Sequence, residues 1–122
     1  MPHIVIAEDE ADVREFLYRA FRRHAPGSTI TAVADGAAAL EVVEQHGCDL
    51  LISDQRMPLK TGIELLRAIR ANGARFPAII ISADMTAELA AIEAGATAFF
   101  YKPLSMNQIR EIIQTWLIPA SS

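Results

Sequence analysis

A small set of acidic, hydroxyl and amine side chains directly follows the apolar segments of this chain, and these residue types suit phosphate chemistry. Glu8 and Asp9 follow the first apolar segment, Asp54 lies at the third, Ser82 at the fourth and Lys102 at the fifth. Carboxylates gathered in one place repel one another unless a cation neutralises them. Magnesium prefers a few carboxylate oxygens together with water and phosphate oxygens. The set therefore indicates a site for a divalent cation, Mg²⁺ or Mn²⁺, beside a phosphate group.

Three of these side chains suit the transfer of a phosphoryl group. The Lys102 ammonium offers a compact charge for phosphate oxygens, and the Ser82 hydroxyl offers a hydrogen bond. An aspartate carboxylate can itself be the nucleophile and form an acyl phosphate, which makes Asp54 the candidate acceptor. An aspartate after a strand is otherwise usually a helix cap or a turn residue, and we interpret Asp35 in that way.

Apolar, β-branched segments alternate with amphipathic segments, which indicates five strand–helix units. The predicted strands are His3 to Ala7, Thr29 to Ala34, Leu50 to Ile52, Ala78 to Ile81 and Ala98 to Tyr101. Apolar residues at helical spacing follow each of these strands. Asp12 is expected to cap the first helix, with Glu15 three residues on. The last helix is expected to present one apolar face, made of Met106, Ile109, Ile113 and Trp116.

The alternation of strands and helices predicts the arrangement of the sheet. Parallel strands need crossover connections, and the helices supply them while covering both faces of the sheet. We therefore predict an α/β fold with a doubly wound parallel sheet of five strands, in the order 2-1-3-4-5. In such open sheets ligands bind beyond the carboxyl ends of the strands. That edge carries the candidate site residues.

Length and composition fit one globular domain and argue against several functional classes. The chain has 122 residues, of which 52% are hydrophobic and 21% charged, so one core is expected. The formal charge of -4 argues against direct binding to nucleic acid. The apolar runs are far shorter than the roughly 20 residues of a membrane span, and no secretory leader is recognisable. We therefore expect a cytoplasmic protein without a membrane segment.

The cysteine and the histidines point to no further chemistry. Cys48 is the single cysteine, so it cannot form an internal disulfide, and we expect a small buried side chain. His3, His24 and His46 lack the spacing of metal ligands. A dinucleotide site and a P-loop are excluded because neither glycine motif occurs.

The order of the motifs resembles that of receiver domains in bacterial two-component response regulators, over essentially the whole chain. The motifs are Glu8-Asp9-Glu10, Asp54-Gln55-Arg56-Met57-Pro58 followed by Gly62, Ser82-Ala83, and Lys102-Pro103. The resemblance implies a flavodoxin-like (βα)5 fold. It also implies a receiver domain over residues 1–118, with residues 119–122 as a tail or the start of a linker.

The resemblance implies a role for each carboxylate of the acidic pocket. Asp54 would accept a phosphoryl group from the phosphohistidine of a sensor histidine kinase or a histidine phosphotransfer protein. Asp9, Asp54 and the backbone carbonyl of Arg56 would hold the metal. Glu8 stands where many receivers have aspartate, and its longer side chain would reach the metal only from the outer part of the pocket or through water.

The resemblance assigns the remaining positions to phosphate binding and switching. Ser82 and Lys102 would bind the phosphoryl oxygens. Phe99, three residues before Lys102, resembles the aromatic residue that swings inward when the serine moves toward the phosphate. The Lys102–Pro103 peptide bond would be cis.

The charged residues that flank the pocket carry a separate hypothesis. Arg56 lies two residues after the acceptor, and Asp84 lies two residues after Ser82. We expect these two side chains to pair across the phosphoryl group and to slow the attack of water on it.

Three functions compete at this stage. The first is a phosphorylation switch, which is not a classical enzyme. Its output would pass through the helix 4, strand 5 and helix 5 face to a downstream protein, a fused output domain or a second copy. We expect Ala90, Ala91 and Glu93 on that face of the fourth helix. The second is a receiver-like binding module that works without phosphorylation. The third, which the spacing of acidic residues fits less well, is an aspartyl-phosphate phosphatase similar to haloacid dehalogenases.

Overall fold

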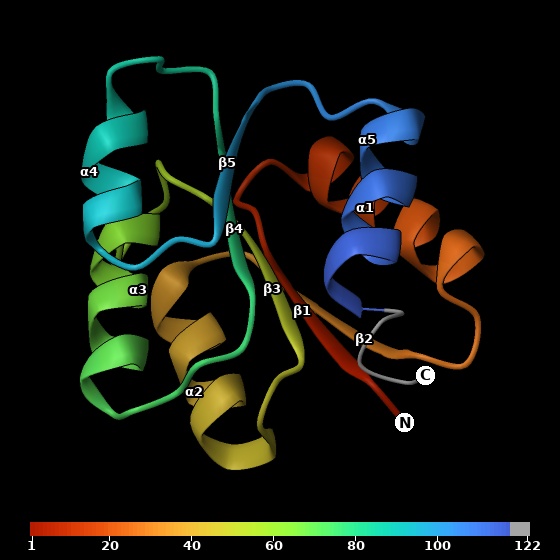
Figure 1. Ribbon diagram of the computed structural model, residues 1–122, viewed down its shortest axis with the longest axis horizontal. Helices are drawn as coiled ribbons and strands as arrows, with labels where there is room; N and C mark the ends of the chain where they lie inside the picture. The colour runs from red at the N-terminus through yellow and green to blue at the C-terminus, as the bar shows by residue number, and fades with distance from the viewer. Residues whose placement is uncertain (118–122) are drawn as a thin grey trace.

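The computed structural model describes residues 1–117 as one parallel sheet between two layers of helices (Figure 1). The strands are β1 (His3–Ala7), β2 (Thr29–Val33), β3 (Leu50–Asp54), β4 (Ala78–Ser82) and β5 (Ala98–Tyr101). The helices are α1 (Ala11–His24), α2 (Gly36–His46), α3 (Gly62–Ala71), α4 (Ala87–Glu93) and α5 (Met106–Ile112). A π-helical turn, η1 (Ile113–Leu117), continues α5. The predicted domain end at residue 118 and the tail 119–122 lie outside the described residues.

The strand order is β2-β1-β3-β4-β5 with every pair parallel, so the predicted fold and topology are confirmed. The register sets which strand ends meet. Ala7 of β1 pairs with Ser53 of β3, and Asp54 pairs with Ile81 of β4. Residues that follow these positions therefore reach the same edge of the sheet.

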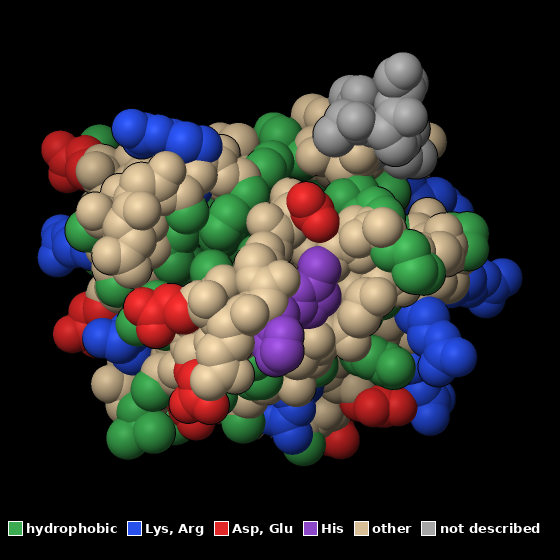
Figure 2. All heavy atoms as spheres, turned by 90° about the horizontal axis from the view of Figure 1, so that it is seen from below, with side chains coloured by type: hydrophobic (Ala, Val, Ile, Leu, Met, Phe, Trp, Pro, Cys, Tyr) green, Lys and Arg blue, Asp and Glu red, His purple; other side chains and the backbone are tan. Residues whose placement is uncertain are grey.

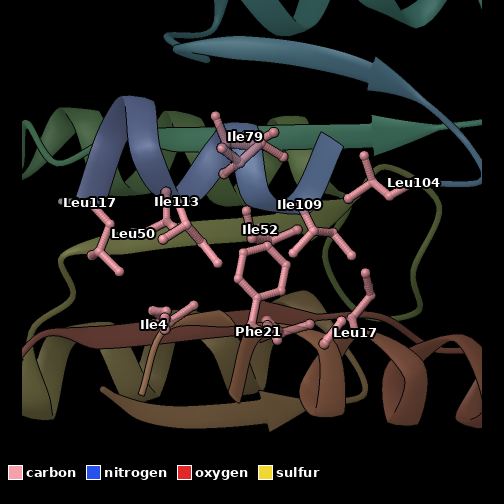
Figure 3. Close-up of a cluster of buried hydrophobic side chains, with 14 of the residues drawn as sticks. Ile4, Leu17, Phe21, Leu50, Ile52, Ile79, Leu104, Ile109, Ile113 and Leu117 are labelled. Carbon is pink, nitrogen blue, oxygen red and sulfur yellow. The ribbon is translucent and has the colours of Figure 1, made fainter. Parts of the chain in front are cut away.

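Alternate residues of the central strands face opposite layers, because successive side chains of a strand point to opposite faces. Ile4 and Ile52 pack with α1 and α5, around Phe21 and Ile109 (Figure 3). Val5, Leu51 and Ile80 pack instead with the layer of α2, α3 and α4. Figure 1 shows the same division, with α1 and α5 on one side of the sheet and the other three helices opposite. The two clusters hold the central strands rigidly.

The predicted start of α1 is wrong by two residues. Its N-cap is Glu10, without a side-chain cap, and Asp12 lies in the first turn. The helix begins early because the Glu8 side chain turns back and accepts a hydrogen bond from the Glu10 N–H, at 3.0 Å, directly after β1. The prediction for Asp35 is confirmed, since its Oδ1 accepts from the Ala38 N–H at 2.7 Å and caps α2.

The predicted apolar face of the last helix is only partly buried. Ile109 and Ile113 lie in the core, and Trp116 packs edge-to-face on Phe100 with ring centroids 6.5 Å apart. Met106 is exposed, because it stands in the first turn of α5 where the helix leaves the sheet edge.

The histidines lie away from the carboxyl edge of the sheet. Figure 2 views the opposite end of the molecule and shows histidine side chains on that face. His3 and His46 line a shallow hollow there with Thr29 and Thr31. The His3 ring contacts the Gly47 carbonyl at 2.9 Å and the Thr31 hydroxyl at 2.8 Å, so its hydrogen bonds serve the structure.

Cys48 is half-buried, and burial raises the pKa of its thiol to about 12, so the thiol is unreactive near neutral pH. Among residues 1–117, the structure contains no helix of the length and apolarity that a bilayer crossing requires.

Candidate functional site

Most of the candidate residues line one pocket at the carboxyl edge of the sheet, and Glu8 and Phe99 are not among its lining residues. The pocket has a volume of about 510 Å³. Its lining comprises Asp9, Glu10, Asp54, Arg56, Ser82, Ala83, Asp84 and Lys102. Each side chain comes from the end of β1, β3, β4 or β5 or from the loop that follows. Strand register, and not proximity in sequence, brings them together.

Asp54 is the last residue of β3 and its carboxylate is held from two sides. Oδ1 accepts from the Gln55 N–H at 2.8 Å, and Oδ2 accepts from Lys102 Nζ at 3.0 Å. The residue is only 5% exposed. The backbone behind it is close-packed, because a Cβ added at Gly62 would lie 2.5 Å from the Asp54 carbonyl oxygen. Asp54 therefore has a fixed direction, with its carboxylate facing the pocket.

Lys102 joins the acidic residues into one network. Besides Asp54, its Nζ lies 2.9 Å from Glu8 Oε1 and 3.6 Å from Glu10 Oε1. Glu8 is completely buried, and its Oε1 receives no hydrogen bond of good geometry, so this close ion pair is its main compensation. A buried carboxylate without a positive partner would be costly.

Burial and pairing shift the pKa values of this ion pair. Burial raises the pKa of Glu8, although Lys102 and the Glu10 N–H act in the opposite direction. Burial alone would lower the pKa of Lys102, but the close contacts of its ammonium with the Glu8 and Asp54 carboxylates outweigh it and raise that pKa. The lysine therefore remains a cation near neutral pH, beside carboxylates that need one.

The end of β4 carries Ser82 and Asp84 on the other side of the pocket. Ser82 is 2% exposed, and its hydroxyl accepts from the Asp84 N–H at 3.0 Å. Asp84 accepts hydrogen bonds from Thr86, which lower the pKa of the Asp84 carboxyl. The Arg56 guanidinium approaches Asp84 to 3.8 Å, with the two side chains 84% and 37% exposed. The two side chains thus lie within ion-pair distance beside the pocket, and their pairing across a phosphoryl group stays a prediction.

Phe99 does not line the pocket. It lies half-buried against the core on the α4 side of β5 and packs edge-to-face on Tyr101, with centroids 5.3 Å apart. The Tyr101 hydroxyl donates to Glu88 of α4 at 2.8 Å. The Lys102–Pro103 peptide bond is cis, as the resemblance to receiver domains implies.

Some residues at the site were missed by the sequence analysis. Glu10 lines the pocket and contacts Lys102, although it was noted only as part of the acidic run. The Arg14 guanidinium, one turn into α1, donates to the backbone carbonyls of Glu8 and Asp9. The position of Arg14 a few residues after the acidic run could have indicated this contact, but an arginine in a helix usually lies on the surface.

The acidic residues fit a hard divalent cation. Carboxylate oxygens of Glu8, Asp9 and Asp54 all lie within 4.8 Å of one another. An all-oxygen donor set with an under-bonded buried oxygen on Glu8 suits Mg²⁺ or Mn²⁺ better than zinc or copper. Asp9 is exposed and free to turn toward such an ion.

Fold and site together define a class of protein, an open parallel α/β domain with an acidic, lysine-bearing pocket at its carboxyl edge. Comparison with known families gives a match to the response regulator receiver domain over residues 4–114. The chain therefore belongs to the response regulator receiver domains of two-component systems.

Individual relatives agree with this assignment. The Regulator of RpoS of Escherichia coli strain K12 is 36% identical over 120 residues, which is 96% of this chain and 35% of that protein. Response regulator MprA of Mycobacterium ulcerans is 30% identical over 108 residues, which is 87% of this chain and 46% of that protein. This chain thus spans less than half the length of these two relatives.

Solved structures show the same fold. The N-terminal domain of an uncharacterized protein from Wolinella succinogenes has a TM-score of 0.89 and 32% identity, with 100% of each chain covered. The chemotaxis response regulator CheY4 of Vibrio cholerae has a TM-score of 0.84 at 23% identity, with 96% of this chain and 99% of that chain covered.

Proposed function

We propose that this domain is a phosphorylation switch in which Asp54 accepts a phosphoryl group from a phosphohistidine. The observation that carries the proposal is the Asp54 carboxylate, fixed between the Gln55 N–H and Lys102 and facing a pocket lined by oxygen donors. The donor would be a sensor histidine kinase or a histidine phosphotransfer protein.

The residues of the pocket suit each part of this reaction. An Asp54 oxygen forms the new P–O bond while the P–N bond to the donor imidazole breaks, and the imidazole nitrogen leaves with the electron pair. Lys102 and Ser82 would bind the phosphoryl oxygens as charge builds on them. Asp9, Asp54 and the Arg56 carbonyl would hold Mg²⁺ or Mn²⁺, with Glu8 behind them. When bound, the ion would neutralise charge shared by carboxylates and phosphate.

The pocket also supports control of the lifetime of the phosphoryl group. The Arg56–Asp84 pair lines the pocket through which water would approach an acyl phosphate on Asp54. We propose that this pair hinders that approach. Hydrolysis would return Asp54 to its free carboxylate and release inorganic phosphate.

Output is proposed to pass through the face made by α4, β5 and α5. The exposed apolar side chains there are Leu89, Ile92, Tyr101 and Met106. The prediction that Ala91 lies on this face is wrong: Ala91 is completely buried, because α4 packs its alanine side against the core. Phosphorylation would change the position of Phe99 and α4, and a downstream protein, a fused output domain or a second copy would bind the altered face.

Intact-mass measurement tests the proposal. The protein is incubated with acetyl phosphate and Mg²⁺, and we expect one phosphoryl adduct that is absent without Mg²⁺ and absent in Asp54→Asn. Asp35→Asn is the matched control, because Asp35 also follows a strand and asparagine still caps a helix. No adduct on the folded, Mg²⁺-supplied protein would favour a phosphorylation-independent binding module. Steady turnover of free phosphate esters would instead favour a phosphatase.

A further inference from the structure

We infer that Arg14 is a positioning residue that holds the acidic loop, residues 8–10, in the shape that binds the cation. The identity of the cation in this inference rests on the proposed function, whereas the position of Arg14 comes from the structure itself. Arg14 lies one turn into α1, and its guanidinium turns back to donate to the Glu8 carbonyl at 2.9 Å and, more weakly, to the Asp9 carbonyl at 3.4 Å.

The acidic loop has few other attachments. The Glu8 N–H donates to the Val33 carbonyl at 3.0 Å, and the Glu10 N–H donates to the Glu8 side chain at 3.0 Å. The Arg14 backbone N–H donates to the Glu10 carbonyl at 2.9 Å. Within residues 1–117, neither the Glu8 nor the Asp9 carbonyl accepts a hydrogen bond from a backbone N–H, so the Arg14 guanidinium is the donor that these two carbonyls have. The Asp9 carboxylate makes no hydrogen bond or ion pair in the same range, so its direction depends on the backbone that carries it.

Repulsion among the three consecutive carboxylates favours opening of this loop. Glu8, Asp9 and Glu10 repel one another, and Asp54 adds a fourth negative charge. Lys102 compensates the side-chain ends of Glu8 and Glu10. Arg14 acts from the opposite side, where its charged donors satisfy the backbone. A cation site needs several oxygens converging at once, so a loose loop would bind a cation more weakly.

Arg14 differs from the other arginines of α1. Arg19 pairs with Glu15 at 2.7 Å on the surface, with a side chain 78% exposed, and it contacts nothing in the pocket. Arg14 is half-buried, and its guanidinium donates hydrogen bonds to the backbone of the acidic loop. The two residues carry the same charge on the same helix, so Arg19→Met is a matched control for Arg14→Met.

A positioning role for Arg14 and a purely electrostatic one predict opposite changes in Mg²⁺ affinity when Arg14 is replaced. Arg14→Met removes a positive charge near the cation site, and if charge alone mattered the affinity for Mg²⁺ would rise. If Arg14 holds the loop, the affinity falls despite the lost repulsion. A hydrogen bond from a charged donor corresponds to about a tenfold change in a binding constant. We therefore expect Arg14→Met to weaken Mg²⁺ binding by about five- to tenfold, and Arg19→Met to leave it unchanged or slightly stronger.

The experiment measures Mg²⁺ affinity by titration calorimetry on the wild type, Arg14→Met, Arg14→Lys and Arg19→Met. Lysine keeps the charge but cannot bridge two carbonyls as the guanidinium does, so Arg14→Lys should lie between wild type and Arg14→Met. Affinity equal to or above wild type in Arg14→Met would overturn the inference. If Arg14→Met does not fold, Arg14→Lys alone decides, because an electrostatic role predicts wild-type affinity for it.

A second measurement separates this inference from the proposed function. Amide hydrogen exchange of residues 8–10 is followed by NMR in the metal-free proteins. We expect the Glu10 amide to exchange faster in Arg14→Met than in the wild type, and at the wild-type rate in Arg19→Met. If the wild type binds no Mg²⁺, the metal dependence of the proposed function fails, while the exchange rates still decide the role of Arg14. Unchanged exchange at residues 8–10 would overturn it.

Discussion

The Lys102 ammonium lies 3.0 Å from Asp54 Oδ2, across 48 residues of sequence. Lys102 follows β5 and Asp54 ends β3, with β4 between these two strands. The lysine side chain therefore reaches across the end of β4 to the candidate acceptor, and it contacts the buried Glu8 at the same time. This contact links the ends of three strands, β1, β3 and β5.

Removing the lysine should destabilise the domain more at neutral pH than at acid pH. Lys102→Met leaves Glu8, which is 0% exposed, without its cation, and breaking a buried pair in this way costs about 3 kcal/mol. Burial already raises the pKa of Glu8, and losing Lys102 raises it further. The folded state then binds an extra proton, so the deficit shrinks as the pH falls through the raised pKa toward that of unfolded glutamate. Urea unfolding at several pH values checks this, and a pH-independent deficit would contradict it.

Close backbone packing behind Asp54 should make Gly62 intolerant of a methyl group. In Gly62→Ala the new Cβ would lie 2.5 Å from the Asp54 carbonyl, so we expect a loss of about 1–3 kcal/mol and slower phosphorylation. Gly27→Ala is the control, because a Cβ there meets nothing within 4 Å and only its φ of 90° is unfavourable. That backbone strain costs about 1–2 kcal/mol without touching the site. Equal phosphorylation rates in the two variants would refute the argument.

The Arg56–Asp84 pair predicts a change in the lifetime of the phosphoryl group. Replacing either residue by alanine should raise the rate of dephosphorylation several-fold, and the double variant should be no faster than the faster single one, because one pair is lost in each case. The side chains are exposed, so stability should hardly change. Phosphate release is measured after acetyl phosphate is removed. The control is Arg67→Ala, which removes an exposed arginine of α3. Dephosphorylation rates of the Arg56 and Asp84 variants equal to that of Arg67→Ala would contradict the hypothesis.

Substitutions in α4 should distinguish its buried side from its output face. Ala91→Glu places a carboxylate in the core and should cost more than about 3 kcal/mol. Leu89→Glu changes a residue that is 70% exposed, so the fold should persist while phosphorylation-dependent association weakens. Thermal unfolding and analytical ultracentrifugation of the phosphorylated protein, alone and with a candidate partner, measure the two effects. Association that survives Leu89→Glu would place the output elsewhere.

The hydrogen bond between Tyr101 and Glu88 should be visible in a tyrosine titration. The Glu88 carboxylate accepts a hydrogen bond from the Tyr101 hydroxyl, and this bond raises the pKa of Tyr101. Any stability from this bond is present below the ordinary tyrosine pKa and lost as the pH rises through the raised value. Glu88→Gln should move the pKa of Tyr101 down, and Tyr101→Phe assigns the ultraviolet signal because only Tyr18 remains. An unchanged titration in Glu88→Gln would show that the bond is absent in solution.

The amino-acid sequence by itself determined the order of strands and helices and the residues at the strand ends. Strand identity follows from short β-branched runs such as Ile4 to Ile6, and this signal is local. Parallel strands place all their carboxyl ends at one edge, so Asp9, Asp54 and Lys102 could be grouped without coordinates. Helix ends such as Asp35 also follow from local hydrogen bonding, although the loop after β1 moved the start of α1 away from Asp12.

The tertiary structure decided which side of each element faces the core and which charges meet. In α4 the larger residues Leu89 and Ile92 are exposed while Ala91 is buried, because only small side chains fit between this helix and the sheet. Hydrophobicity alone would predict that the side of α4 with Leu89 and Ile92 is buried. The pairing of Glu8 with Lys102 and the attachment of Arg14 to the acidic loop depend on side chains from distant segments that meet only after the sheet has formed. Local sequence patterns do not predict such contacts, because charged residues such as Glu8, Arg14 and Lys102 usually lie on the protein surface.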